Sequence, residues 1–391
     1  MLKTVLRRLN GNRWKAISLL IGLILAISIA YCIPVYSDAV LQRILIKTLE
    51  DAQQTTGKYP AVLSFDYRIA GVKKDAVFIE STIDSAFDAL CDEMPMSVQT
   101  HGKMLKYEMF RRKIEEENRS ENVVLTYLED FENHVHVVSG RMFNPERSDG
   151  VVEVVASSRQ MVKTLLTLNK IYEYSSMYPD ETDLLRLEIV GIVEPNDPSD
   201  LYWLTPFDQI TGGMFTAREA FDAKIAENMT YARHVTQFTR LEVFDFYDIR
   251  TDTAKTVTAL FNRANEQLNA TFPKNLLTFG MVPAVETYLA DSATVEVSMY
   301  ILTIPIFILL AFYIIMVSRL KLQSEQSEIS VMQSRGAGRG YILGLYLIES
   351  LILMAAAIGI GPLLGGFLCK IVGASNGFLE FVNRKALDFR M

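Results

Sequence analysis

Three long apolar stretches limit most strongly what this chain can fold into. Ala16–Val35 and Val297–Val317 contain no charged residue, and Tyr341–Cys369 contains a single one, Glu349. A helix needs about 20 apolar residues to cross the hydrocarbon core of a bilayer, because each residue adds about 1.5 Å. The sequence therefore predicts three membrane-spanning helices, which we place at residues 16–35, 297–317 and 341–372. The first is interpreted as an anchor, because its apolar core exceeds the roughly 7–15 residues of a cleaved signal peptide.

The residues between the first two spans, 36–296, have the composition of a folded domain outside the membrane. Strand-like runs such as Val98–Met109 and Leu185–Val193 alternate with helical runs such as Asp252–Phe272. There is no regular βαβ order, so we predict an α+β domain. Helical stripes follow the first span and, at Leu276–Leu289, precede the second. The predicted fold class is an α-helical membrane protein with three spans and a large α+β domain carried on helical stalks.

Positive charges near the spans predict the orientation in the membrane, because cytoplasmic flanks are enriched in Lys and Arg. Residues 1–15 contain five basic residues and no acidic one, and the 318–340 connection contains four basic residues against two acidic ones. Residues 36–296 contain 26 Lys and Arg against 41 Asp and Glu. We therefore expect 1–15 and 318–340 in the cytoplasm, and 36–296 and the 373–391 tail outside, in a multi-pass cell-membrane protein.

Several motifs of common enzyme classes do not occur in the sequence. There is no GxxxxGK[ST] phosphate-binding loop, no HExxH and no CxxC. Only Cys91 lies within 36–296, so no disulfide is possible inside that domain. Glu132, His134 and His136 alternate and could share one face of a strand around zinc, but a solvated strand face is the better interpretation. We expect no catalytic residue, no cofactor and no metal, and therefore no enzyme.

The 318–340 connection is too short to be a domain, and its pattern predicts a contact surface. Ile329 and Met332 can fill a groove in a partner protein, and Arg335 and Arg339 can pair with carboxylates there. Three glycines let the backbone turn back toward the bilayer: Gly336, Gly338 and Gly340. The alternative is a plain interfacial turn whose charges face water and lipid headgroups.

Glu349 is a carboxylate inside a predicted span, where ionisable groups are costly and usually face protein or water. We expect it to pair with a neighbouring helix rather than to carry a proton or a substrate. Small residues within Ala355–Gly366 allow close helix packing, which we expect to include a dimer contact.

The stretch Glu328–Ile342 resembles the cytoplasmic connection of FtsX/MacB-type ABC permeases, which reads roughly E-I-G-x-L-x-A-x-G-A-S-R-x-x-I. The matching residues are Glu328, Ile329, Met332, Gly336, Ala337, Arg339 and Ile342. Arg335 stands where an apolar residue is frequent, and Gly338 where Ser or Thr is. The order of spans around a large outer domain is similar to the family as well. So are four segments elsewhere: Leu347–Leu351, Ser139–Arg141, Val151–Val155 and Leu187–Val193.

The resemblance implies a permease subunit of an ATP-driven exporter or mechanotransmission complex, in which a separate P-loop ATPase subunit hydrolyses ATP. It implies a MacB-like domain at 36–296. It also implies that the subunit forms a homodimer or a permease heterodimer in the lipid bilayer, and that nucleic acid is not a partner. The residues implied to couple to the ATPase are Glu328, Ile329, Met332, Arg335, Gly336 and Arg339. The family has a fourth span, which we do not find here, so we expect a fragment or a short form.

The alternative function is a membrane sensor or regulator that binds an extracytoplasmic ligand or a cell-wall hydrolase without transport. A third hypothesis is a purely structural membrane anchor. A neighbouring ATPase favours either of the first two functions over the anchor. Co-purification with a P-loop ATPase is the observation that would reduce the uncertainty most.

Overall fold

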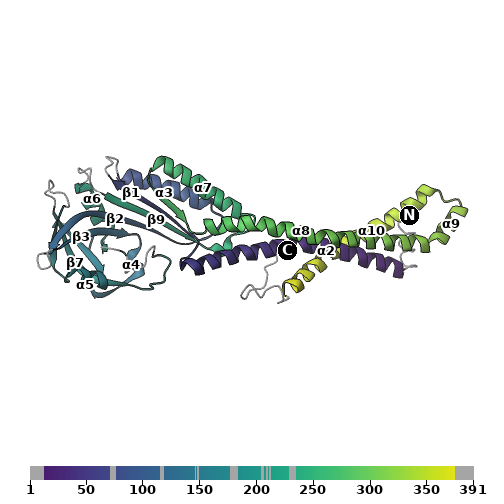
Figure 1. Cartoon of the computed structure of the whole chain (residues 1–391), viewed down its shortest axis with the longest axis horizontal. Helices are drawn as coiled ribbons and strands as arrows, with labels where there is room; N and C mark the ends of the chain where they lie inside the picture. Colours follow the sequence, from purple (N-terminus) through teal and green to yellow (C-terminus); the bar gives the residue numbers. More distant parts are fainter. Residues whose placement is uncertain are drawn as a thin grey trace. The chain divides into compact units, whose positions relative to one another are not determined.

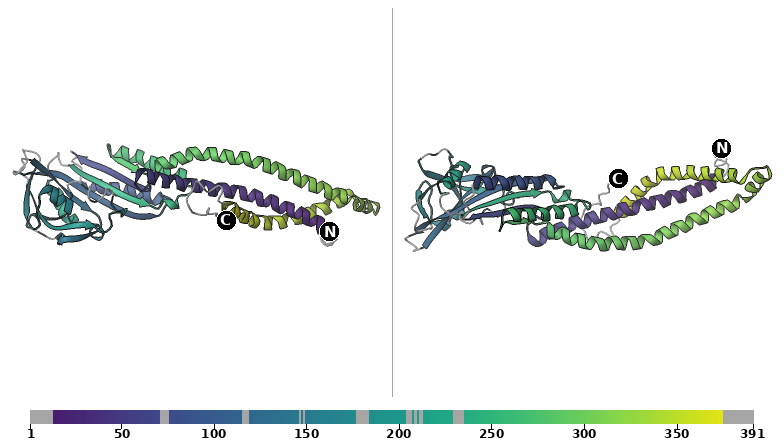
Figure 2. Two further views of the ribbon diagram at one scale, coloured as in Figure 1. Left: turned by 60° about the horizontal axis from the view of Figure 1, so that its bottom comes forward. Right: turned by 90° about the horizontal axis from the view of Figure 1, so that it is seen from above.

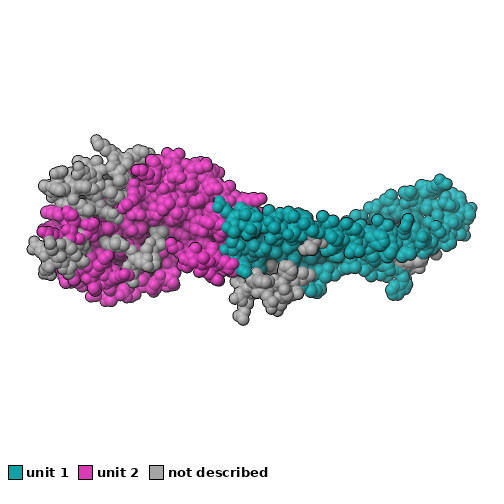
Figure 3. Space-filling view, viewed as in Figure 1, with its two compact units in different colours: residues 1–48, 286–391 teal, residues 49–285 magenta. Residues whose placement is uncertain are grey.

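The structure is a computed structural model with two compact units, one formed by residues 1–48 and 286–391 and the other by residues 49–285 (Figure 3). It describes residues 13–70, 76–114, 119–145, 147, 149–176, 184–203, 207, 210, 213–228 and 235–374. Most of the predicted N-terminal cytoplasmic segment, 1–12, and most of the predicted outer tail, 375–391, lie outside the described residues.

The first unit is built from long helices, as the apolar stretches predict. They are α2 (Arg13–Thr56), α8 (Val282–Ser324) and α10 (Arg339–Ala374), and the short α9 (Gln326–Ser334) connects the last two. The views in Figure 2 show α2, α8 and α10 running alongside one another, with α9 at the end where α8 meets α10. Each long helix contains one internal proline, at Pro34, Pro305 and Pro362 respectively.

By length and composition, three helices of the described chain could cross a membrane. No residue in the most apolar stretch of α8 is buried within the structure. Its exposed side chains include Ile301, Ile308, Leu309, Phe312 and Ile315. A continuous apolar surface of this kind is unstable in water and marks a membrane or protein contact, so the composition of α8 fits a membrane protein.

Both predicted helical extensions beyond the spans are tested by the structure, with different outcomes. The first is confirmed, because α2 continues from the apolar stretch to Thr56 without interruption. The second is partly wrong, because Leu276–Phe279 is a strand, β10, and α8 starts only at Val282. Leu277 and Phe279 are buried while Leu276 is exposed, which is the two-residue period of a strand.

The second unit is organised around one mixed sheet, which in the described part of the chain has ten strands. Nine of them follow the order β10-β1-β9-β2-β3-β8-β5-β7-β4, and β6 pairs with both β2 and β7. The strands β2, β3, β8, β5, β7 and β6 therefore form a closed ring of neighbours, which removes several exposed edges. Most pairs are antiparallel, while β3–β8 and β5–β7 are parallel.

The strands are β1 Val62–Ala70, β2 Val98–Ile114, β3 Arg119–Leu128, β4 Val135–Gly140, β5 Val151–Ser157, β6 Ile171–Ser176, β7 Leu184–Pro195, β8 Gly213–Phe215, β9 Val235–Phe244 and β10 Leu276–Phe279. The helical elements are α3 Ala76–Glu93, α4 Phe131–His134, α5 Ser158–Thr164, α6 Arg218–Asn228, η3 Phe246–Asp248 and α7 Ala254–Thr271. Strands with intervening helices in this order make an α+β domain, as predicted.

Helices α3 and α7 lie side by side over β1 and β9 (Figure 1). Their apolar faces supply much of the core, since Ile83 and Phe87 of α3 and Val257 of α7 are fully buried, as is Phe65 of β1. Burying one such side chain stabilises the fold by about 1.5–3 kcal/mol. A second cluster of buried side chains, which includes Phe131, fills the part of the sheet around β4, β5 and β7.

Charged side chains hold α3 on the sheet beside this apolar core. Glu80, Asp84 and Asp88 are spaced by four residues and therefore lie on one face of α3. Lys103 of β2 contacts Glu80 at 3.1 Å and Asp84 at 2.5 Å. Arg240 of β9 contacts Asp84 at 2.7 Å and Asp88 at 2.6 Å. Each base thus bridges two carboxylates, and the set fixes the register of α3 on the sheet.

Glu80 has a second basic partner, Arg218 of α6, whose two terminal nitrogens donate to the two carboxylate oxygens at 3.0 and 2.7 Å. Burial alone would raise the pKa of Glu80, but the hydrogen bonds from Arg218 and Lys103 outweigh it and leave this pKa below its usual value. A carboxyl whose pKa is lower in the folded chain than in the unfolded chain stabilises the fold above its unfolded pKa. That stability is lost as the pH falls through the folded pKa.

We expect Glu80→Gln to lower the free energy of unfolding at neutral pH by about 1–3 kcal/mol, because it leaves Lys103 and Arg218 short of a charged acceptor. The difference from the unsubstituted chain should shrink as the pH falls below 4.5, the ordinary value of the Glu pKa. Denaturant unfolding of the purified chain at several pH values measures both effects.

Asp222→Asn is the matched control, because Asp222 is about half-exposed and also pairs with Arg218. This control should change stability by less than about 0.5 kcal/mol. A Glu80→Gln effect of equal size at acid and neutral pH would contradict the role assigned to the Glu80 charge.

Candidate functional site

The connection between α8 and α10 is the candidate site, and it begins at a buried glutamate. Glu325 ends α8, since its N–H donates to the carbonyls of Lys321 and Leu322 at 3.1 and 3.2 Å. Its own carbonyl accepts the N–H of Ile329 at 3.0 Å and so starts α9. The Tyr346 hydroxyl of α10 donates to Glu325 Oε2 at 2.6 Å. The junction of α8 and α9 is therefore held against α10.

A buried ion pair joins α8 and α10 near the same end. Lys321 Nζ lies 2.6 Å from Glu349 Oε1, and the side chains are only 11% and 5% exposed. Glu349 Oε2 has no hydrogen-bond partner among the described residues. Glu349 is thus in contact with a neighbouring helix. A buried ion pair of this kind is weak evidence for added stability, but it is strongly sensitive to the loss of one partner.

The end of α9 shows why one of the three glycines is required. Gly336 has a φ of +85°, in the left-handed region that side chains rarely adopt. Its N–H donates to the carbonyl of Gln333, and the N–H of Ala337 donates to that of Met332, both at 3.0 Å. Gly338 and Gly340 have no positive φ, and open space surrounds the place where a Cβ on either would stand. The expected turn therefore depends on Gly336 alone.

The exposed surface of α9 differs from the one that the sequence suggested. No residue of Gln326–Ser334 is fully buried. Ile329 and Met332 are half-buried, whereas Val331 is 50% exposed. The apolar group that α9 offers most openly to a partner is thus Val331, which sequence reasoning did not select.

Basic and acidic residues lie close to this exposed valine in the sequence. Arg335 and Arg339 are exposed and form no ion pair with any residue that the structure describes. Glu328 is also exposed on α9. Of the predicted coupling residues, Glu328, Ile329 and Met332 lie on α9, Arg335 and Gly336 directly follow it, and Arg339 begins α10. Their arrangement can bind a protein surface that has an apolar hollow and nearby carboxylates.

Sequence reasoning missed Glu325 and Tyr346 as positioning residues, although a signal was present. Lys321 and Glu325 are separated by four residues, and Tyr346 and Glu349 by three, so each pair shares one face of its helix. Polar pairs on the facing sides of two apolar helices indicate a contact between those helices.

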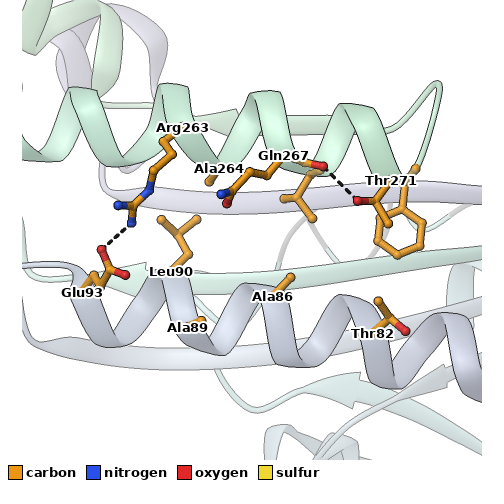
Figure 4. A pocket seen from close by; sticks show the side chains of 11 residues that line it. Thr82, Ala86, Ala89, Leu90, Glu93, Arg263, Ala264, Gln267 and Thr271 are labelled. Carbon is orange, nitrogen blue, oxygen red and sulfur yellow. Dashed lines mark hydrogen bonds and ion pairs between the residues drawn. The ribbon is translucent and has the colours of Figure 1, made fainter.

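The second unit has a hollow between α3 and α7 of about 140 Å³ (Figure 4). Its walls are mostly small or apolar, and an Arg263–Glu93 ion pair lies at one end. Ligand pockets usually have about 300–1,000 Å³ and several converging polar groups. The hollow is smaller than that, and its polar lining side chains are Thr82, Glu93, Arg263, Gln267 and Thr271.

The alternating Glu132, His134 and His136 do not lie together on one strand. Glu132 and His134 belong to α4, and only His136 lies in β4. His134 stacks on Tyr202 with ring centroids 3.6 Å apart and lies 2.8 Å from Asp200. Among the described residues no group of three or more metal-binding side chains was found. The prediction of one shared strand face is wrong. Glu132 and His134 lie in a helix, where side chains two residues apart point in different directions, whereas on a strand they would share a face.

One further motif spacing stands at the end of α10. Residues 373–377 read Gly-Ala-Ser-Asn-Gly, which is the G-x-S-x-G spacing of a nucleophile elbow. That motif requires a strand followed by a sharp turn and a helix. Here the first two residues of the motif, Gly373 and Ala374, are the last two of α10. Ser375 and the following residues lie outside the described part of the chain.

One comparison with known proteins bears on the same region. Residues 300–387 match the FtsX-like permease C-terminal family. The chain is also similar to a crystallised domain of a protein assigned as a permease, from Porphyromonas gingivalis. That likeness has 11% identity and a TM-score of 0.25, and it covers 56% of this chain and 90% of the other. A TM-score this low does not show a shared fold. No curated protein matches the chain.

The family match spans most of α8, all of α9 and all of α10, and so contains the Lys321–Glu349 pair and the exposed connection. FtsX-like permeases are generally non-enzymatic membrane components of ABC systems. The C-terminal part of this chain, residues 300–387, is thus similar to the C-terminal region of FtsX-like permeases.

Proposed function

We propose that the chain is the permease subunit of an ABC-type exporter or mechanotransmission complex, and that α9 binds the ATPase subunit. FtsX-like permeases typically pair with such a subunit. The observation that supports the proposal most is the fixed presentation of α9 inside the matched region. Tyr346 holds the junction of α8 and α9, and the Lys321–Glu349 pair joins the helices on either side of α9. Val331, Arg335 and Arg339 are exposed.

The geometry suits a part that transmits movement. A contact helix on a mobile loop would absorb a displacement, whereas one held by buried polar contacts passes it to the helices on either side. Here those helices are α8 and α10. Because α8 starts at Val282 and α2 ends at Thr56, α8 and α2 both continue in sequence into residues 49–285. A movement of α9 can thus reach the second unit through continuous helix.

The proposed topology places residues 1–15 and 318–340 in the cytoplasm and the α+β domain outside the cell membrane. It rests on the basic flanks and on the apolar surfaces of the three long helices. We further propose that the domain at 36–296 is MacB-like and that the subunit works as a homodimer or permease heterodimer. The competing function is a membrane sensor or regulator that binds an extracytoplasmic ligand or a cell-wall hydrolase without transport.

Placing a photo-crosslinking amino acid at Val331 should yield an adduct with a P-loop ATPase, because this side chain faces outward from α9. Val162 on α5 is the matched control, since it is also an exposed valine. The full chain would be expressed in its native host, irradiated in intact membranes and analysed by mass spectrometry. An ATPase adduct at both positions, or at neither, would contradict the proposed contact.

Glu349→Gln should destabilise the helices of the first unit and reduce the Val331 crosslink to the ATPase. The substitution leaves the Lys321 ammonium buried without its carboxylate, a change that costs about 3–5 kcal/mol in buried ion pairs. Replacing both partners, Lys321→Met with Glu349→Leu, should recover most of the thermal stability measured by helical circular dichroism in detergent. If the single variant is as stable as the double variant, the pair does not hold α8 and α10 together.

Single cysteines test the orientation in a chain whose three native cysteines are replaced by serine. Ser199→Cys, in the second unit, should react with a membrane-impermeant maleimide on intact cells. Ser330→Cys, on α9, should react only after the cells are permeabilised. Both serines are exposed in the structure, so burial does not confuse the comparison. Labelling of position 330 from outside would reverse the proposed topology.

A further inference from the structure

Helices α2 and α10 approach each other through small residues that recur every four positions. On α10 these are Gly361, Gly365 and Cys369, and on α2 they are Ser28 and Cys32. Residues four apart lie on one face of a helix. Each helix therefore presents a narrow seam to the other, and each seam ends in a cysteine.

The seam is too close for larger side chains. A Cβ atom on Gly361 would lie 2.6 Å from Ile27 Cγ2, and one on Gly365 would lie 2.7 Å from the carbonyl oxygen of Ser28. The Ser28 hydroxyl donates to the carbonyl of Gly361 at 2.8 Å. Small residues and interhelical hydrogen bonds of this type let helix backbones meet closely in a membrane.

One turn further along the same seam, the two thiols meet. Cys32 Sγ and Cys369 Sγ are 2.7 Å apart, although 337 residues separate them in sequence. Carbon atoms in contact are about 3.5–4.0 Å apart, and a disulfide bond measures about 2.0 Å. Cys369 Sγ also lies 3.3 Å from the carbonyl oxygen of Cys32. Cys369 is fully buried, while Cys32 is partly exposed.

Packing alone requires only a small side chain at each of these two positions, as the glycines and Ser28 illustrate. It does not require that two sulfur atoms face each other across the seam. The chain has three cysteines, and two of them meet at this point. The third, Cys91, lies in the second unit on α3 and is part of no such pair among the described residues.

We propose that Cys32 and Cys369 are a redox-active pair that forms a reversible disulfide between α2 and α10. The oxidant is a small-molecule disulfide. The thiolate of the more exposed Cys32 attacks one sulfur of that disulfide and releases the first thiolate of the oxidant. The thiolate of Cys369 then attacks Cys32 Sγ and releases the second. The two cysteines lose two protons and two electrons, and one molecule of disulfide becomes two thiols.

The new bond would complete the linkage of the long helices. Lys321 and Glu349 already join α8 to α10, and Tyr313 of α8 lies against Gly22 of α2. A disulfide at the seam would add a covalent restraint between α2 and α10. It would therefore limit changes of the angle between these two helices when the cysteines are oxidised.

The test counts thiols in the full chain carrying Cys91→Ser, so that only the pair remains. The detergent-purified protein is incubated with reduced or with oxidised glutathione, denatured, and treated with a maleimide that adds mass. We expect two reactive thiols after reduction and none after oxidation, in a monomer whose intact mass falls by two hydrogen atoms. Retention of both thiols, attached glutathione, or a disulfide-linked dimer would each overturn the proposal.

The matched control moves one thiol around the helix. In Cys91→Ser with Cys32→Ser and Ile33→Cys, the chain still has two cysteines, but the one on α2 is rotated by about 100°. This variant should not form the internal bond under the same conditions. If this variant loses its two thiols to an internal disulfide as fully as the Cys91→Ser chain does, the facing positions of Cys32 and Cys369 are not what allows the bond to form. The thiol count does not depend on an ATPase partner, so this result is separate from the proposed permease function.

Discussion

A buried charge pair sets the geometry on which the candidate site depends. An ammonium and a carboxylate that leave water lose hydration energy, and only close contact in a fixed arrangement recovers it. Lys321 and Glu349 must therefore stay together, which restrains the ends of α8 and α10. The connection between these helices contains only α9 and a few turn residues. With both attachment points restrained, α9 has few alternative positions, and Val331 remains on its outer side.

The same constraint explains why α9 can be exposed and yet ordered in place. A nine-residue helix is too short to be stable alone in water, because nucleation is costly and few hydrogen bonds repay it. Here its first hydrogen bonds are anchored by Glu325, and its last turn is closed by the left-handed Gly336. The stability of α9 thus comes from the buried groups that flank it rather than from its own sequence.

Local sequence patterns predicted the individual helices and strands of this chain better than they predicted which strands and helices contact one another. Apolar length predicted the three long helices, and alternation predicted strands such as β2 and β7, because both are properties of neighbouring residues. The pairing of β6 with both β2 and β7 depends on contacts between distant segments, for which a single sequence holds no direct signal. Leu276–Phe279 was mistaken for helix because a four-residue strand next to a long helix can satisfy either period.

The candidate site shows the same division. The sequence indicated that Glu349 needs a partner. That Lys321 is this partner, and that Tyr346 positions Glu325, becomes evident only from the packing of α8 against α10. Cys32 and Cys369 were placed in separate spans, and their spacing of 337 residues hides that they meet. The greater exposure of Val331 than of Ile329 was not evident from the sequence, because it depends on how the flanking helices hold α9.

The single proline inside each long helix gives the first unit a mechanical property that its length alone would not suggest. Proline has no N–H, so the carbonyl four residues earlier loses its helical donor. Pro34, Pro305 and Pro362 therefore release the carbonyls of Ala30, Ile301 and Ile358. At each of these points a helix bends with fewer hydrogen bonds to break than elsewhere. The long helices are thus stiff segments joined at three compliant points, which confine any bending to defined depths along the bundle.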